Sequence, residues 1–187
     1  SFSPEAEKRT LLRRATLDLT GLPPEPDEIK RFLEDRSPLA YNRLIDRLLA
    51  SPAYGERWGR HWLDVAGYAD SEGYNEKDTE RKWAWRYRDY VVEAFNDDMP
   101  WDQFIREQVA GDEMLEPPYE DLKSEEIEKL VATGFLRMAP DGTGSGANDE
   151  LARNQVIAET LKIVSSSFLG MSVGCAQCHD HRHDPIT

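Results

Sequence analysis

The sequence predicts an all-α array of about seven or eight helices. No segment alternates apolar and polar residues as a half-buried strand does. Apolar residues recur instead at steps of three and four, and Ser-Pro pairs, which suit helix starts, stand at Ser3, Ser37 and Ser51. Because 187 residues can bury a sizeable core, we expect a single domain over residues 1–187.

Four helices are predicted in the first third of the chain. The first begins at Ser3-Pro4 and ends near Gly21, and the second spans residues 27–35. The third follows Ser37-Pro38 and is expected to bury an apolar stripe made of Tyr41, Leu44, Ile45, Leu48 and Leu49. The fourth spans residues 53–69.

His61 is the only histidine that lies far from the C-terminal end of the chain. The fourth predicted helix places it among Tyr54, Trp58, Trp62 and Val65 at helical spacing. One interpretation is a core histidine bonded to a neighbouring carbonyl or carboxylate. The other is a metal ligand or a cofactor-pocket residue, since neutral imidazole is a common metal ligand. The sequence leaves both open.

The remaining helices are predicted over residues 80–96, 101–110, 125–137 and 149–169. Residues 70–79 lack the ligand alternation of an EF-hand and predict a solvated loop. Gly111 suits the left-handed position after a helix. The glycine-rich residues 139–148 lack the Lys-Ser/Thr ending of a phosphate-binding loop, which favours a linker or lid.

The C-terminal segment holds both cysteines and three of the four histidines of the chain. Cys175-Ala176-Gln177-Cys178-His179 has the Cys-x-x-Cys-His spacing that attaches a c-type haem. Cys175 and Cys178 would bond the two vinyl groups, and His179 would be the proximal iron ligand. We therefore predict one covalently bound haem c in an electron-transfer module or a haem-dependent oxidoreductase.

The second axial position has several candidates. His61, Met138 or Met171 would complete a six-coordinate electron carrier. An open position would instead admit oxygen, peroxide or substrate, with His61 or Asp64 in acid-base catalysis. We expect Asp180 and Asp184 to orient His179 or His181.

A non-redox domain is the alternative interpretation of the same residues. Cys175 and Cys178 would then form a disulfide. A metal would be held by three histidines and one acid, namely His179, His181 and His183 with Asp180 or Asp184. Such a domain would bind or hydrolyse glycans, or would act only as a scaffold.

The net charge of the chain argues against some classes of ligand. A net charge of −13 and a pI near 4.8 argue against nucleic acid and anionic membranes as ligands. No apolar run approaches the roughly 18 residues of a membrane span, and the N-terminal residues lack the pattern of a signal peptide. We expect the chain to be part of a longer protein that is periplasmic or otherwise exported.

Six blocks of sequence, in order, resemble the domain of unknown function found in planctomycete cytochrome-C-type proteins. The likeness extends over nearly the whole chain, and the blocks that carry it are residues 14–24, 54–64, 85–89, 96–104, 132–137 and 175–181. The resemblance implies a large exported protein with an adjacent cytochrome-c-like module or redox partner, and a redox role in polysaccharide breakdown. Arg182-His183 departs from the family pattern, in which an aromatic residue follows a basic one.

Overall fold

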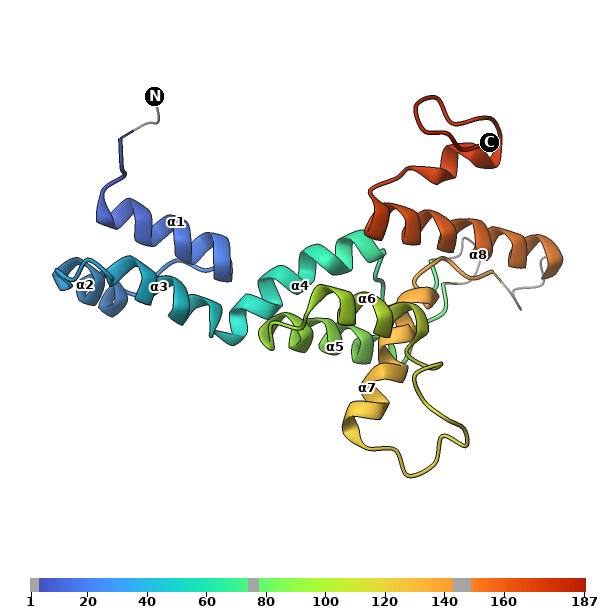
Figure 1. Cartoon of the computed structure of the whole chain (residues 1–187), viewed down its shortest axis with the longest axis horizontal. Helices are drawn as coiled ribbons and strands as arrows, with labels where there is room; N and C mark the ends of the chain where they lie inside the picture. Colours follow the sequence, from blue (N-terminus) through green and yellow to red (C-terminus); the bar gives the residue numbers. More distant parts are fainter. Residues whose placement is uncertain (1–3, 74–77, 143–148) are drawn as a thin grey trace. The chain divides into compact units, whose positions relative to one another are not determined.

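The structure is a computed structural model that describes residues 4–73, 78–142 and 149–187. Eight α-helices and three short 3-10 or π helices account for its regular elements (Figure 1). Within these residues there is no strand, only an isolated bridge between Ser71 and Glu80. The all-α prediction is therefore confirmed.

The chain divides into two compact units. The first comprises Ser1–His61 and Val92–Asp98, and the second comprises Trp62–Val91 and Met99–Thr187. The boundaries fall inside α4 (Pro52–Ala66) and α5 (Ala84–Asn96), so each of these helices contributes residues to both units.

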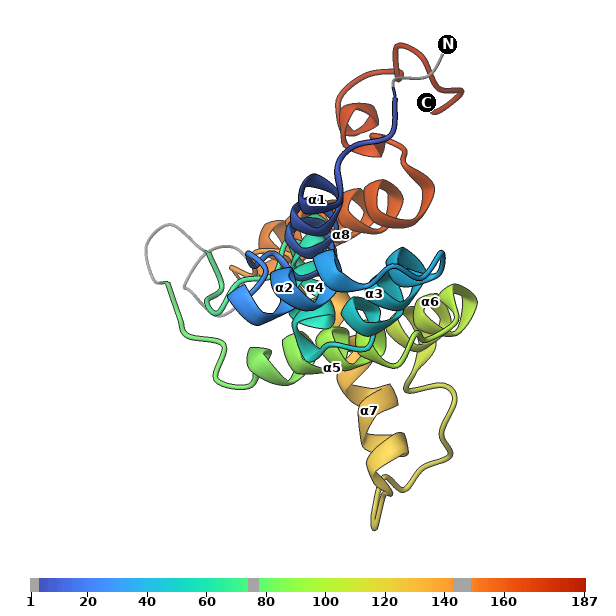
Figure 2. The same cartoon turned by 90° about the vertical axis from the view of Figure 1, so that its left-hand side faces the viewer.

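The first unit is built on α1 (Lys8–Thr20), α2 (Pro26–Glu34) and α3 (Ala40–Leu49). Both views show these three helices side by side (Figures 1 and 2). Their apolar faces meet in one core formed by Leu12, Ala15, Phe32, Ala40, Leu44 and Leu48. The predicted stripe on α3 is confirmed at Leu44 and Leu48, whereas Tyr41 and Leu49 at its edges are exposed.

The helix starts differ from the Ser-Pro prediction. α1 begins at Lys8 after Glu7, while Ser3 lies outside the described residues. The hydroxyl of Ser37 accepts a hydrogen bond from the N–H of Leu39 at 3.2 Å, so this serine closes a turn ahead of α3. Only Pro52 stands at the start of its helix as predicted.

Gly55 lets α4 approach the last turns of α5 within the first unit. Its N–H donates to Oδ1 of Asn96 at 2.8 Å, and the Asn96 amide donates to the Pro52 carbonyl at 3.3 Å. A Cβ atom on Gly55 would lie only 2.3 Å from the carbonyl oxygen of Val92. Glycine is therefore required here by close packing.

The second unit contains the remaining elements. They are α6 (Trp101–Ala110), α7 (Ser124–Ala132), the 3-10 helix η1 (Thr133–Arg137), α8 (Asp149–Val164), the π helix η2 (Ser165–Leu169) and the 3-10 helix η3 (Val173–Gln177). The connector from Gly111 to Lys123 forms a loop beside α7 (Figure 2). α6, α7 with η1, and α8 with η2 match the three helices predicted after residue 100, whereas η3 was not predicted.

Trp62 is the centre of the aromatic core of the second unit. It is buried and contacts four rings, those of Trp101, Phe104, Phe135 and Phe168, at centroid distances of 5.1–5.8 Å. Edge-to-face and offset contacts of this kind add to the free energy gained by burial.

A polar network crosses this core. The Tyr87 hydroxyl donates to Oε1 of Gln108 at 2.5 Å, and the Trp62 indole N–H donates to the same oxygen at 3.0 Å. The Tyr90 hydroxyl donates to the buried carboxylate of Glu107 at 3.0 Å. Burial raises the pKa of both tyrosines, so both hydroxyls remain protonated donors.

The prediction of a left-handed backbone conformation at Gly111 is wrong. Its φ of −61° and ψ of −32° are right-handed, so it does not provide the expected left-handed cap. A Cβ atom at this position would lie 2.1 Å from the Lys129 carbonyl oxygen and 2.4 Å from that of Glu107. The residue is glycine because α7 packs against the end of α6 at this point.

Three apolar residues inside the predicted helices are exposed: Val65, Trp83 and Leu151, at 49%, 58% and 68% exposure. Trp83 lies before the first residue of α5, so it does not share the inward face of that helix. Leu151 lies in the first turn of α8. Periodicity assigns a face to a residue only inside the regular part of a helix.

Candidate functional site

The candidate site lies in the segment that follows α8. Gly170, with φ of 65°, ends η2 in the left-handed conformation, and the Met171 N–H donates to the Ser165 carbonyl at 3.1 Å. The segment then turns into η3, which contacts α8 (Figure 1). Gly174 lies against the side chain of Lys162. A Cβ atom on Gly174 would be 3.3 Å from Cδ of this lysine.

The two cysteines are the first and last residues of one 3-10 turn. Cys175 lies within η3, and the N–H of Cys178 donates to the Cys175 carbonyl at 3.4 Å. Cys178 directly follows η3 as its C-cap residue, with φ of −119° and ψ of −24°. Both thiols are free and exposed.

His179 has a defined tautomer. Its Nδ1 lies 2.8 Å from the carbonyl oxygen of Asp180. A carbonyl oxygen can only accept, so Nδ1 carries the proton. In the neutral ring the lone pair is then on Nε2, on an exposed side chain. The imidazole is thus oriented to offer Nε2 to a metal ion.

The expectation that the Asp180 carboxylate orients His179 needs correction. The partner of His179 is the main-chain carbonyl of Asp180. The sequence does not reveal which main-chain carbonyl a histidine uses, because every residue has such a carbonyl. The only sequence hint was the position of Asp180 directly after the histidine.

His181 holds the C-terminal segment together. Its Nδ1 accepts hydrogen bonds from the main-chain N–H groups of His183 and Asp184, at 3.2 and 2.8 Å. Its Nε2 lies 3.0 Å from the hydroxyl of Ser172. An Asp184 carboxylate oxygen lies 3.4 Å from the same Nδ1, but because this nitrogen accepts, it has no proton to donate, so the expected hydrogen bond from His181 to an aspartate carboxylate is not formed. Both ring nitrogens are therefore engaged within the protein.

The histidines and acids of this segment do not form a metal site among themselves. No group of three or more His, Cys, Asp or Glu side chains that could hold a metal ion occurs in the described ranges. The rings of His181 and His183 are 6.4 Å apart between centroids. Because the lone pair of His181 Nδ1 already accepts two N–H groups, these residues do not fit the metal-dependent alternative.

His61 lies in the first unit, whereas the Cys-x-x-Cys-His segment lies in the second. Its side chain is exposed and packs edge-on against the Trp58 indole, with ring centroids 5.4 Å apart. The interpretation as a core histidine is therefore wrong. Its role as an iron ligand remains a prediction.

The other candidates for the second axial position differ in exposure. Met138 is buried at 4% exposure, and Met171 is half-buried just before η3. Asp64 is exposed on α4. Of these two methionines, Met171 could therefore bring its sulfur to an iron with less disruption of the core than Met138.

Comparison with known proteins gives one match. Residues 1–187 match the family model PSCyt2, described as a protein of unknown function (DUF1549). The chain belongs to the PSCyt2 family. This confirms the resemblance drawn from its six sequence blocks. No curated protein and no solved structure matches it. In the part of this PSCyt2 chain that the structure describes, no helix has the length and apolar character needed to cross a bilayer.

One participant in the site of this PSCyt2 domain was missed by the sequence analysis. Ser172 bonds His181 across nine positions of the chain. Serine is common near helix ends, and neither its type nor its spacing points to a distant histidine. The contact follows from the fold of the segment.

Proposed function

We propose that this domain attaches one haem c through Cys175 and Cys178, with His179 as an axial iron ligand, and that it serves as an electron-transfer or redox module. The observation that carries this proposal is the 2.8 Å contact between Nδ1 of His179 and the Asp180 carbonyl. It selects the tautomer in which Nε2 is the free donor atom.

The cysteines fit the same role. Both thiols are exposed and follow one another by three residues on a 3-10 turn, which leaves them open to reaction with one flat group. Each would form a thioether bond with one vinyl group. A bound haem would supply one-electron chemistry at its iron.

His181 supports the site without binding the cofactor. It fixes the backbone after His179 through the N–H groups of His183 and Asp184, and it fixes the backbone before η3 through Ser172. These bonds close the segment on both sides of the Cys-x-x-Cys-His motif. An ordered segment keeps the two thiols and Nε2 of His179 in place before attachment.

The charge of the second unit suggests its partner. That unit has 12 Lys and Arg residues against 23 Asp and Glu residues, whereas the first unit has 11 against 13. The acidic charge of the chain is thus concentrated in the unit that holds the motif. A redox partner with a basic surface, such as an adjacent cytochrome module, would be steered toward it. Export and a link to polysaccharide breakdown rest on the family resemblance.

The test is to express the chain in a bacterial periplasm with cytochrome c maturation active. We expect a pyridine haemochrome spectrum of c type and an intact mass raised by one haem that survives denaturation. Cys178→Ala should lose one thioether bond, and His179→Ala should retain the mass gain but change the visible spectrum. His183→Ala is the matched control, since His183 is exposed in the same segment.

Two results would overturn the proposal. One is protein that emerges from active maturation with no haem and with a Cys175–Cys178 disulfide. The other is protein that binds a stoichiometric metal ion through its histidines. Either result would promote the non-redox alternative.

A further inference from the structure

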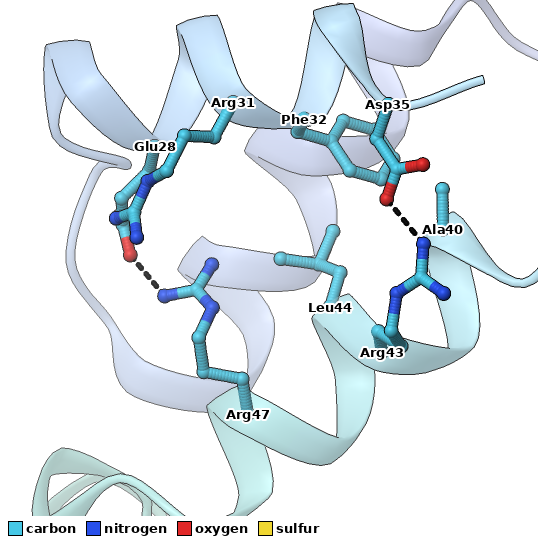
Figure 3. A pocket seen from close by; sticks show the side chains of 8 residues that line it. All are labelled: Glu28, Arg31, Phe32, Asp35, Ala40, Arg43, Leu44 and Arg47. Carbon is cyan, nitrogen blue, oxygen red and sulfur yellow. Dashed lines mark hydrogen bonds and ion pairs between the residues drawn. The ribbon is translucent and has the colours of Figure 1, made fainter. Parts of the chain in front are cut away.

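Two arginine-rich cavities in the first unit differ in how their charges are balanced. The first lies between α2 and α3 and measures about 190 Å³ (Figure 3). Arg43 pairs with Asp35 at 2.5 Å, and Arg47 pairs with Glu28. The hydrogen bond from Arg43 lowers the pKa of Asp35 and keeps it ionised. These guanidinium groups already have carboxylate partners.

The second cavity measures about 490 Å³ and is lined by Arg13, Arg14, Asp18, Tyr41 and Arg57, with Ala15 and Leu17 beneath them. Among the residues that the structure describes, no carboxylate lies within ion-pair distance of Arg13, Arg14 or Arg57. Three arginines therefore line one cavity, and Asp18 is the one acid in its lining.

Arg57 adds an independent observation. Its Nε atom is buried and has no hydrogen-bond partner in the described part of the chain. Its side chain packs over Gly21, where a Cβ atom would lie 3.0 Å from Cδ of the arginine. Gly21 has φ of 71° and carries no side chain, which leaves room for this packing. An unpaired buried donor costs free energy, so this arginine is held in place at a cost. Because Nε is covered by the protein, a ligand in the cavity would bond the terminal N–H groups of Arg57.

We propose that this cavity is a binding site for a tetrahedral oxyanion, sulfate or phosphate, either free or as an ester group on a larger molecule. Three arginines and one aspartate give a local charge of +2, which a dianion neutralises. Planar guanidinium groups bind such oxyanions through paired N–H donors. The exposed Tyr41 hydroxyl supplies one further donor at the rim.

The site lies wholly in the first unit, which does not contain the Cys-x-x-Cys-His motif. It is therefore tested on the 187-residue chain without cofactor. Sodium sulfate, sodium phosphate and sodium acetate are titrated separately at constant ionic strength, with chloride as the balancing anion. NMR of arginine Nε–H groups reports on Arg57 directly.

We expect saturable binding of sulfate and phosphate, with acetate at least about tenfold weaker because it forms fewer charged hydrogen bonds. Arg14→Gln and Arg57→Gln should each weaken sulfate binding about tenfold or more, since a hydrogen bond to a charged group contributes about 1.5–3 kcal/mol. Tighter binding of sulfate than of dianionic phosphate would indicate that the site selects a sulfate group, and the reverse that it selects a phosphate group.

Arg60→Gln is the matched control, because Arg60 is exposed on the same helix one turn from Arg57 and does not line the cavity. Arg13 and Arg14 are also exposed, so their variants keep the test valid if Arg57→Gln fails to fold. The proposal is overturned by Nε–H shifts that never saturate, or by equal loss of binding in Arg14→Gln and Arg60→Gln.

Discussion

The main-chain N–H of Asp184 donates a 2.8 Å hydrogen bond to Nδ1 of His181. A second N–H, from His183, donates to the same nitrogen at 3.2 Å. Because Nδ1 accepts, Nε2 carries the proton in the neutral ring and donates to the Ser172 hydroxyl. One imidazole thus ties three points of the C-terminal segment together.

Replacement of His181 by alanine should loosen this segment while the helices stay folded. The two N–H groups would lose their acceptor, at a cost of about 0.5–1.5 kcal/mol for each hydrogen bond, because neither group is fully buried and water can replace the histidine. Amide hydrogen exchange at His183 and Asp184 should become faster, and the yield of haem attachment should fall. His183→Ala removes an exposed ring and should change neither. Unchanged exchange in His181→Ala would show that the segment is held by other contacts.

The carbonyl that orients His179 belongs to Asp180, but the carboxylate of Asp180 takes no part. Asp180→Asn should therefore leave the His179 tautomer unchanged, with the proton on Nδ1. Long-range proton–nitrogen NMR of the unloaded chain measures this directly. A shift of the proton to Nε2 in the variant would mean that the side chain, not the main chain, controls the ring.

The sequence predicted the type of nearly every element, because apolar residues at helical spacing report a 3.6-residue period regardless of the partner helix. The sequence-based prediction failed for residues that lie outside the helix itself, such as Trp83, which precedes the first residue of α5. It also misjudged Gly111, because a glycine required by a crossing helix looks the same as one required by a positive φ.

The site was predicted as a set of residue types, but not as a set of contacts. Cys175, Cys178 and His179 follow from spacing alone. The supporting bonds do not, because they use main-chain atoms of Asp180, His183 and Asp184. Any residue could supply those atoms, so only the folded backbone reveals them.

Gln108 is the acceptor on which the buried polar network of the second unit depends. Gln108→Leu would leave the Tyr87 hydroxyl without its acceptor in a buried site. We expect a loss of about 1–3 kcal/mol in the free energy of unfolding. Urea unfolding measures it, with the exposed Gln155→Leu on α8 as the control. Equal stability of the two variants would show that Tyr87 finds another partner.

Tyr68 should make the stability of the protein fall at high pH. Burial, together with a 2.6 Å hydrogen bond to the Asp70 carboxylate, raises the pKa of Tyr68 from 10.0 to about 12. The folded state therefore holds this proton more tightly than the unfolded state does. The resulting stabilisation is complete below pH 10 and is lost as the pH rises toward 12.

Two variants separate the causes of this shift. Tyrosinate absorbance should show a group that titrates near pH 12 and disappears in Tyr68→Phe, whereas the more deeply buried Tyr87 and Tyr90 titrate at still higher pH. In Asp70→Asn the pKa of Tyr68 should fall but stay above its ordinary value, because burial is the larger cause and the carboxylate the smaller. If the late titration persists unchanged in Asp70→Asn, the hydrogen bond contributes nothing. If it vanishes there, the carboxylate, and not burial, is the main cause.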